Sequence, residues 1–450
     1  MYSKDLEMAI KIAEMVNKNH GTTFYVGGYV RDLIMGVENK DIDIEIHGIT
    51  PKMLEEILDS LGKRMQFGSS FGIYNLKGYG IDIAMPRKEK NIGAGHKDFD
   101  IDVDPFIGTY NAAKRRDFTI NSLMKDVLTG EIIDHFGGLN DIKSKIIRHI
   151  DKDTFIEDPL RVLRGCQFAS RFGFDICPET INLCKEMSLE NLSRERIMGE
   201  LEKALLKSPK PSVFFELLRK MNHLHFWFPE LEDLIGIEQN PKHHAEGDVW
   251  VHTMMVLDQG VKYVNDLNNK LGFMISCLTH DFGKVICTEI VKGEIHSYNH
   301  ETLGLPIVKR FLKRLTNEKN LINFVLNQTE FHMKPNTLAA NNSSIKSTNK
   351  MFDQAIEPEA LIAIAICDGL GKIAPREYIS YDKFFEERLN IFKEYMSRPY
   401  VTGTDLINAG VKPNDKFSEY LAYAHKLRLA GVLKENALKQ TLAFIRKNNL

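Results

Sequence analysis

Two carboxylates stand two residues apart in the segment DIDIEI, at Asp41 and Asp43. Alternate residues of a β-strand point to the same face, so a strand here would place both carboxylates side by side and turn Ile42 and Ile44 toward a core. Neighbouring carboxylates repel one another unless a cation lies between them. Mg²⁺ is held in proteins by one or two carboxylates together with substrate phosphates. The spacing therefore predicts a magnesium site, to which Asp82 in the strand-like segment GIDIAM adds a third carboxylate.

A glycine turn precedes this pair. Gly27 and Gly28 end the apolar run FYV, and Arg31 lies in the first turn of the helix that we expect to follow. Glycines let backbone N–H groups approach phosphate oxygens near a helix start, and the guanidinium group offers a fork of donors to the same oxygens. A D-x-D spacing alone is also typical of a solvated strand end. Combined with the glycines and Arg31, it indicates nucleotidyl transfer, in which two metal ions activate a hydroxyl group and stabilise the departing pyrophosphate.

The order of these motifs resembles the signature of the polymerase-β-like nucleotidyltransferase superfamily. Three later segments narrow the resemblance: KRRDFTINSL (114–123), EDPLRVLRGCQFASRFGF (157–174) and RERIMGELEKALL (194–206). They are similar to the second motif, the nucleotide-selecting helix and the helix-stabilising motif of the tRNA nucleotidyltransferase and bacterial poly(A) polymerase family. The resemblance covers about residues 22–235. It implies a bacterial-type enzyme that builds or repairs the CCA end of tRNA from CTP and ATP without a nucleic-acid template.

The segment EDPLR holds the residues that the resemblance makes the base-selecting group. Asp158 and Arg161 are three residues apart, so on a helix they share one face. An aspartate acceptor and an arginine donor fork can hydrogen-bond to the Watson–Crick edge of cytosine or adenine. The resemblance implies that Glu157 holds Arg161 in place, although acids at this position also suit a helix N-terminus. It further implies contacts to the triphosphate, the sugar or the base from Arg116, Asp117, Asn121 and Arg164.

The stretch from Arg87 to Asp104 is polar, contains glycines and basic residues, and is predicted to be a mobile loop. In the CCA-adding members that the sequence resembles, a flexible loop at this place is needed to change from C to A addition, and CC-adding members have a shortened one. The length of the stretch favours complete CCA addition. A solvated charged loop without such a role would have the same composition.

A second group of metal-binding residue types lies downstream. His280 and Asp281 are adjacent, His252 precedes them in a helix-like segment, and Asp368 follows. Imidazole nitrogen and carboxylate oxygen together suit a divalent ion such as Mn²⁺, Ni²⁺ or Co²⁺, with Mg²⁺ as a further candidate. An adjacent His and Asp can bind one ion together only if other helices supply the remaining ligands. The order H…HD…D resembles the ligand pattern of HD-domain phosphohydrolases.

This second resemblance implies a metal-dependent phosphatase and 2′,3′-cyclic phosphodiesterase fused behind the transferase. A tRNA end that bears a phosphate must become a free hydroxyl before a nucleotide is added, so both activities fit one repair function. The neighbouring residues that are candidates for a further shell, a second metal position or a phosphate contact are His300, His332 and Lys284.

Length and composition set outer bounds. The chain has 450 residues, which predicts roughly two to four domains. Its net charge of −2 excludes a global basic field, so contact with tRNA must come from local patches. The six cysteines form no C-x-x-C pair, which indicates reduced thiols and a cytoplasmic protein. We expect no signal peptide and no membrane partner, and both monomer and dimer remain open.

The elements predict an α+β chain with an N-terminal polymerase-β-like mixed sheet, then an all-α neck and body, then an all-α HD domain. Strands are predicted at FYVGG, DIDIEI, GIYNLKG and GIDIAM, a helix at PKMLEEILDSLG, and a loop at LAANNSSIKSTNK. The tail segment VTGTDLINAGVKP resembles family regions that contact the tRNA body. The predicted domains are a nucleotidyltransferase head (1–140), a helical nucleotide-selecting and RNA-binding neck (141–240), an HD domain (241–375) and a helical tail (376–450).

Three other functions fit parts of the sequence. A poly(A) polymerase of the same superfamily shares the transferase motifs. A CC-adding or an A-adding enzyme would carry out only part of the reaction. An RNA-binding protein with two inactive sites is disfavoured, because the carboxylates and histidines that the chemistry needs are present.

Overall fold

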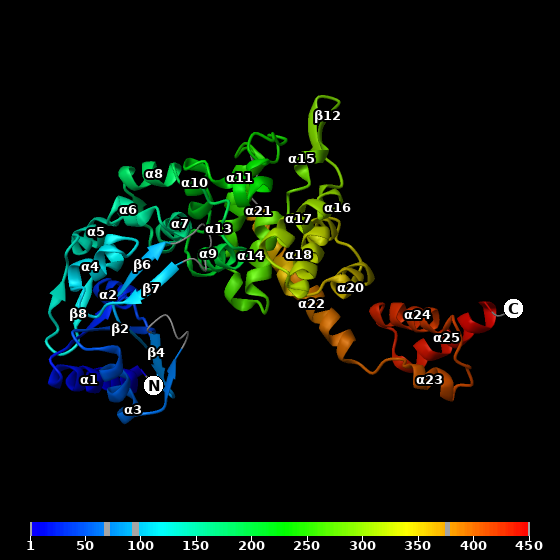
Figure 1. The fold of residues 1–450 in the computed structure, drawn as a ribbon. Coiled ribbons are helices and arrows are strands. Elements are labelled where there is room, and N and C mark those ends of the chain that lie inside the picture. The colour runs from blue at the N-terminus through cyan, green and yellow to red at the C-terminus, as the bar shows by residue number, and fades with distance from the viewer. Residues whose placement is uncertain (1, 67–72, 92–98, 374–378, 449–450) are drawn as a thin grey trace. The chain divides into compact units, whose positions relative to one another are not determined.

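The computed structural model describes residues 2–66, 73–91, 99–373 and 379–448. The chain divides into two compact units, residues 1–227 and 228–450 (Figure 1). The first unit combines a mixed sheet with helices and the second is almost wholly helical, so the predicted α+β class is confirmed. The division into four domains stays a prediction.

A seven-stranded sheet forms the centre of the first unit, in the order β3-β4-β5-β2-β1-β8-β9. The central strand β2 pairs antiparallel with β1 and parallel with β5. Isoleucines on alternate positions of β2 and β5 are buried against apolar side chains of α1 and α3. The strands are β1 (Thr22–Val26), β2 (Ile42–His47), β3 (Arg64–Gln66), β4 (Ile73–Leu76), β5 (Ile81–Ala84), β8 (Met124–Asp126) and β9 (Ile132–Ile133).

The described part of this unit has twelve helical elements, of which α1, α2 and α3 pack against the sheet. Among the others, α7 packs against α9 and α10, and the short parallel pair β10 (Ile146–Ile147) and β11 (Asp175–Ile176) lies beside it. The helices are α1 (Tyr2–Lys18), α2 (Gly27–Ile34), α3 (Pro51–Leu61), α4 (Thr109–Lys114), η1 (Thr119–Asn121), α5 (Gly138–Ser144), α6 (Lys152–Phe155), α7 (Leu160–Phe172), α8 (Pro178–Lys185), α9 (Arg194–Lys207), α10 (Ser212–Lys220) and α11 (Leu224–Trp227).

The stretch predicted as a loop between Arg87 and Asp104 contains two strands. β6 (Arg87–Asn91) and β7 (Phe99–Val103) pair antiparallel, with Arg87 opposite Val103 and Asn91 opposite Phe99. The loop prediction is therefore wrong at both flanks. The residues between the strands, including the two glycines, lie outside the described residues.

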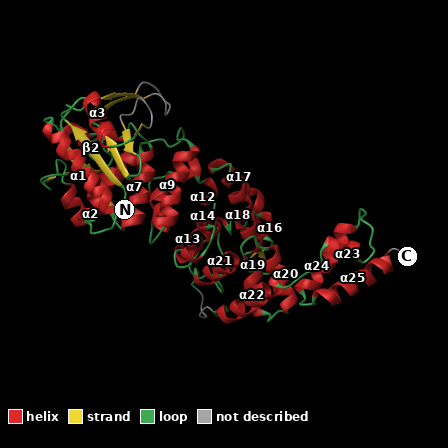
Figure 2. Ribbon diagram, turned by 90° about the horizontal axis from the view of Figure 1, so that it is seen from below, coloured by secondary structure: helices red, strands yellow, loops and turns green. Residues whose placement is uncertain are grey.

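In its described residues, the second unit consists of helices and one hairpin. The hairpin, β12 (Thr288–Val291) with β13 (Glu294–Ser297), interrupts the segment predicted to be all helical. The last three helices form a group with a small apolar core of their own (Figure 2). The helices are α12 (Pro229–Glu232), α13 (Val249–Gly260), η2 (Val264–Asp266), α14 (Lys270–Thr279), α15 (Lys284–Cys287), α16 (His300–Leu303), α17 (Leu305–Leu315), α18 (Lys319–Phe331), α19 (Met333–Ala340), α20 (Ile345–Gln354), α21 (Pro358–Leu370), α22 (Asp382–Ser397), α23 (Gly403–Asn408), α24 (Phe417–Leu429) and α25 (Lys434–Asn448).

Most of the segment LAANNSSIKSTNK, predicted to be a loop, is helical. It supplies the end of α19 and the start of α20. Ser344 begins α20 as its N-cap, because its side-chain oxygen accepts a hydrogen bond from the N–H of Ser347 at 3.4 Å. None of the helices in the described ranges is long and apolar enough to cross a membrane.

Candidate functional site

A cavity of about 630 Å³ opens in the first unit where β1 ends, beside β2, β5, α2 and α7. It gathers almost all of the residues that the sequence predicts for the nucleotidyltransferase site. Asp41 and Glu157 are not among its lining residues. The predicted residues that line it are Gly27, Gly28, Arg31, Asp43, Asp82, Arg116, Asp117, Asn121, Asp158, Arg161 and Arg164.

Two of the three predicted carboxylates lie side by side on neighbouring strands. Asp43 on β2 lies directly opposite Asp82 on β5 in the parallel register. Burial raises the pKa of Asp43 to about 6, and the charges of Asp82 and Asp41 add to this while Arg116 opposes it. Asp82 is exposed and accepts a hydrogen bond from Nδ2 of Asn75 at 2.5 Å. A partly buried carboxylate pair of this kind is suited to a divalent cation, and Asp41 lies exposed one residue before β2.

The glycine turn leaves room for a charged side chain. Gly27 has a φ of +64°, and a Cβ at this position would lie 3.1 Å from Nη1 of Arg116. Both facts favour glycine, because other residues are strained at this φ and would crowd the guanidinium group. Arg116 is in turn held by a residue that the sequence reasoning missed: its Nη2 donates to Oε2 of Glu45 at 3.1 Å.

Glu45 is buried on β2, two residues after Asp43, and its Oε1 lies 2.9 Å from Nε2 of His47. Burial alone would raise the pKa of Glu45, but Arg116 and His47 outweigh it and lower the pKa to about 2. The signal was present in the sequence, because Glu45 continues the alternation of DIDIEI on the side of Asp43.

The buried side chain of Arg31 lines the cavity, but its donors already have partners in the protein. Nε donates to Oδ1 of Asp32 and Nη1 donates to Oδ1 of Asn121, both at 2.7 Å. The guanidinium group also lies over the ring of Phe172, 4.5 Å from its centroid. The structure thus places Arg31 in the wall of the site and connects α2 to η1 and α7.

Asp117 extends this hydrogen-bond network to α7. Its Oδ1 accepts from Nδ2 of Asn121 at 2.9 Å, and its Oδ2 accepts from Nε of Arg164 at 2.7 Å. Burial would raise the pKa of Asp117, but Arg164 and Asn121 lower it below its usual value. Arg31, Asn121, Asp117 and Arg164 therefore form a continuous chain of hydrogen bonds in the wall of the cavity.

The predicted base-selecting residues lie at the start of α7. Asp158 precedes the helix, and its Oδ2 accepts a hydrogen bond from Nη2 of Arg196 on α9 at 2.8 Å. Arg161 donates from Nη1 to the carbonyl of Thr154 at 2.6 Å and from Nη2 to the carbonyl of Arg115 at 2.8 Å. Both side chains are thus fixed in orientation within the cavity wall. Arg196 was not singled out from the sequence.

Glu157 is exposed beside the start of α7. Its predicted role as a support for Arg161 stays a prediction.

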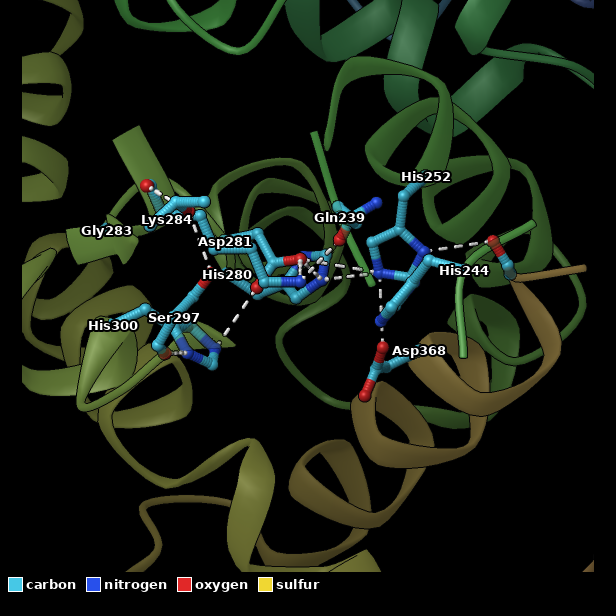
Figure 3. Close-up of polar contacts among 12 residues, drawn as sticks. Gln239, His244, His252, His280, Asp281, Gly283, Lys284, Ser297, His300 and Asp368 are labelled. Carbon is cyan, nitrogen blue, oxygen red and sulfur yellow. Dashed lines mark hydrogen bonds and ion pairs between the residues drawn. The ribbon is translucent and has the colours of Figure 1, made fainter. Parts of the chain in front are cut away.

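The second unit brings together all four residues of the predicted HD site (Figure 3). His252 lies on α13, His280 and Asp281 directly follow α14, and Asp368 lies on α21. Nε2 of His252 is 3.2 Å from Oδ1 of Asp368 and 3.4 Å from Oδ2 of Asp281. Nε2 of His280 is 3.2 Å from the same Oδ2. All four residues are buried.

A second histidine pair lies on the other side of Asp281. Nε2 of His300 is 3.2 Å from Oδ1 of Asp281, and Nε2 of His332 is 4.0 Å from it. The two Nε2 atoms of His300 and His332 are 3.2 Å apart. Asp281 thus offers one carboxylate oxygen to each pair of histidines, as a bridging ligand would. Asp281, His300 and His332 form a group that could hold a metal ion.

The tautomers of these histidines support metal binding. Nδ1 of His280, His300 and His332 lies 2.7–2.9 Å from the carbonyl oxygens of Cys277, Ser297 and Thr329, respectively. A carbonyl only accepts, so each Nδ1 donates in these contacts, and Nε2, which faces Asp281, is the nitrogen that a metal ion would use.

His332 is neutral near pH 7, because burial and the two neighbouring histidines lower its pKa to about 3. Oδ2 of Asp281 is buried and accepts no hydrogen bond of regular geometry within the described residues. The contact of this oxygen with Nζ of Lys284, at 2.7 Å, is an ion pair. Imidazole nitrogens that converge on a buried carboxylate fit divalent cations, so the residues present suit the metal that the sequence pattern implies.

Two further groups support this cluster. Glu246, missed in the sequence, lies with Oε1 3.2 Å from Nδ1 of His252 and 2.8 Å from Nδ1 of His244. Such a carboxylate fixes the orientation of a metal-binding imidazole. Nζ of Lys284, predicted to contact phosphate, forms an ion pair with Oδ2 of Asp281 at 2.7 Å and donates to Oε1 of Gln239 at 2.8 Å. Its buried ammonium group is thus already engaged with the cluster.

The mixed sheet holds paired carboxylates beside a glycine turn. They lie in a cavity that is also lined by the acid and the arginine at the start of α7. These features together define a nucleotidyltransferase. Residues 23–148 match the model of the poly A polymerase head domain, and residues 173–235 match that of the probable RNA- and SrmB-binding site of polymerase A.

Curated proteins similar to this chain include multifunctional CCA proteins. That of Pasteurella multocida is 34% identical over 401 residues, which cover 86% of this chain and 91% of the relative. That of Psychromonas ingrahamii is 37% identical over 303 residues, covering 65% of this chain and 70% of the relative. The chain therefore belongs to the family of multifunctional CCA proteins, which are tRNA nucleotidyltransferases.

Solved structures show the same fold. The CCA-adding enzyme of Thermotoga maritima, solved with tRNA, is 21% identical with a TM-score of 0.63, and covers 98% of this chain and 95% of its own. The CCA-adding enzyme of Bacillus stearothermophilus, solved with CTP, is 18% identical with a TM-score of 0.70, and covers 99% and 98%.

Proposed function

We propose that this protein adds or repairs the 3′-terminal CCA of tRNA with CTP and ATP as substrates. The observation that carries the proposal is the register that sets Asp43 opposite Asp82, in one cavity with Gly27, Asp158 and Arg161. Curated relatives named for CCA, and structures of similar fold with tRNA, CTP or ATP, support the same substrates.

Each part of the cavity has a role in this reaction. Asp43, Asp82 and Asp41 would hold Mg²⁺, which activates the attacking hydroxyl and stabilises the pyrophosphate. Backbone N–H groups at Gly27 and Gly28, with Arg116, bind the triphosphate. The 3′ oxygen of tRNA forms a bond to the α-phosphorus, the bond to the pyrophosphate oxygen breaks, and the hydroxyl proton passes to water. Asp158 and Arg161, held by neighbouring groups, meet the edge of the base as the protein's own template.

We propose that the strand pair β6–β7 decides how many of the three nucleotides the protein adds. Arg87, at the start of β6, lines the cavity, so a movement of the strand pair would change the shape of the site. We therefore propose that the protein adds all three nucleotides of CCA. Transcripts of tRNA lacking all three nucleotides should gain CCA with CTP and ATP, and those ending in CC should gain one A with ATP alone. A product that stops at CC indicates a CC-adding enzyme, and a long tail indicates a poly(A) polymerase.

We further propose that the second unit is a metal-dependent phosphatase and 2′,3′-cyclic phosphodiesterase. The bridging position of Asp281 between two histidine pairs supports it. Mn²⁺, Ni²⁺, Co²⁺ or Mg²⁺ bound there would activate a water molecule. The water oxygen bonds to phosphorus, the bond from phosphorus to a ribose oxygen breaks, and that oxygen takes up a proton. A cyclic diester thus opens to a monoester, which is then cleaved to a hydroxyl and inorganic phosphate.

The phosphohydrolase proposal is tested with metal-depleted protein. Release of phosphate from RNA with a 3′-phosphate should return on addition of one of these ions, while the same samples are titrated for bound metal. Phosphate release that is independent of metal, or a cluster that binds none of the four ions, would contradict it. As part of the proposed CCA addition, we also propose that the tail, residues 376–450, contacts the tRNA body and that the protein is cytoplasmic.

A further inference from the structure

A cavity of about 390 Å³ lies in the second unit between α16, α19 and α20. It belongs to neither of the sites described above. Its volume falls within the range of about 300–1,000 Å³ that small-molecule sites occupy. Its wall contains residues from three helices, so it is a built depression and not the gap beside one side chain.

The cavity adjoins the histidine cluster. Two of its lining residues, Glu301 and Met333, directly follow the cluster residues His300 and His332 in the chain. Oε2 of Glu301 lies 3.7 Å from Nδ1 of His300. None of the cluster residues lines the cavity, but Glu301 places one end of it next to the ring of His300.

The chemistry of the wall favours a nucleotide. Lys334 and Lys350 both line the cavity and are exposed, and neither forms an ion pair among the described residues. Met333 and Leu338 offer apolar surface to the same cavity, and Met333 is 40% exposed. Nζ of Lys334 lies 3.8 Å from the centroid of the Phe331 ring and within electrostatic range of Lys350, Glu330 and the lining residue Glu301. Two neighbouring ammonium groups suit a phosphate, and thioether and aliphatic groups suit the face of a base.

We propose that this cavity binds the terminal nucleotide of an RNA whose 3′ or 2′,3′-cyclic phosphate lies at the histidine cluster. The proposal rests on the phosphohydrolase function proposed above. The base contacts Met333 and Leu338, and Lys334 and Lys350 bind the phosphate on the 5′ side of that nucleotide. The site accordingly distinguishes the end of an RNA chain, which has this 5′ phosphate, from a free nucleoside 2′,3′-cyclic phosphate, which lacks it.

Kinetic parameters of phosphate-ester hydrolysis test this distinction. The substrates are the dinucleotide CpA with a terminal 2′,3′-cyclic phosphate and adenosine 2′,3′-cyclic phosphate. In the variant with Lys334→Gln and Lys350→Gln, the KM for the dinucleotide should rise about tenfold relative to that for the mononucleoside, because a charge-assisted contact is lost. Lys313→Gln, an exposed lysine on α17, is the matched control and should leave this ratio unchanged. An unchanged ratio in the double variant overturns the proposal.

Photo-cross-linking supplies a readout that does not need catalysis. CpA with 8-azidoadenine and a 3′-phosphate is irradiated with the full-length protein, and the modified peptides are identified by mass spectrometry. The adducts should lie within residues 333–354 and should decrease in the double lysine variant. Adducts confined to other segments overturn the proposal. If the wild-type protein hydrolyses neither substrate but these adducts form, the result contradicts the proposed phosphohydrolase function and still supports the nucleotide site.

Discussion

Replacement of Glu45 by glutamine should lower the stability of the first unit and weaken its binding of the nucleotide. Glu45 is 4% exposed and its pKa is lowered from the usual 4.5 to about 2. A difference of about 2.5 pKa units corresponds to about 3 kcal/mol of stability at neutral pH. This contribution is present above pH 4.5 and is lost as the pH falls toward 2, because the depressed pKa belongs to the folded state. Glu45→Gln should therefore destabilise the unit by about 2–3 kcal/mol at pH 7, since glutamine keeps the shape but not the charge.

The protein offers a convenient probe for this measurement. It has two tryptophans, Trp227 in the first unit and Trp250 in the second. In a Trp250→Phe background, the fluorescence of Trp227 follows denaturant unfolding of the first unit. The difference in unfolding free energy between the protein with Glu45 and its Glu45→Gln variant should be constant above about pH 5 and narrow by up to about 1.4 kcal/mol per pH unit at lower pH. Exposed Glu131→Gln is the control and should show no comparable difference.

The same substitution should raise the KM for CTP about tenfold, because Arg116 loses the carboxylate that orients it beside Gly27. A stability difference that does not change with pH would refute the role of the Glu45 charge. A difference of the expected size with an unchanged KM would refute the inference that Glu45 acts on the nucleotide through Arg116.

Three further substitutions separate the parts of the account. Asp281→Asn should abolish phosphate release and reduce bound metal, measured by mass spectrometry of the metal content, while CTP incorporation continues; loss of both activities would contradict two independent sites. Glu246→Gln should weaken metal affinity by about 10–100-fold in a competition titration, because His252 loses its orienting carboxylate; unchanged affinity would count against that role. Arg196→Met should increase incorporation of UTP relative to CTP, because Asp158 loses the guanidinium group that fixes it; unaltered selectivity in single-nucleotide assays would argue that Asp158 is held by other means.

The central part of the first site could be predicted because its signals are local. A strand fixes which residues share a face, so DIDIEI and GIDIAM were enough to propose that Asp43 and Asp82 are neighbours. The glycine turn was predictable for the same reason. The backbone at Gly27 has a positive φ, which glycine adopts without strain, so the sequence marks this position directly.

The hydrogen-bond partners depend on distant parts of the chain and were not predictable. Arg31 was expected to reach phosphate, yet its partner Asn121 lies 90 residues away. Glu246 holds His252 through a segment that has no helical or strand periodicity. Such contacts are set by tertiary packing, which single-sequence patterns do not report.

Two local predictions failed for a different reason. The strand β6 consists of RKEKN, whose residues have low β propensity. Its antiparallel hydrogen bonding with β7 stabilises the strand in spite of this composition. The start of α20 is polar, but Thr348 and Asn349 are buried, and Nδ2 of Asn349 donates to the carbonyl of Leu429 at 2.9 Å. In both cases a partner strand or helix outweighed the intrinsic preference of the segment.

The most direct test of the account is incorporation of labelled CTP into tRNA that lacks its CCA end, by wild-type protein and by the Asp43→Asn variant. If Asp43 holds the catalytic metal, the variant should lose more than about a thousandfold in rate while it still shifts tRNA in a native gel. Incorporation at the wild-type rate by Asp43→Asn would contradict the assignment of the cavity as the nucleotidyl-transfer site.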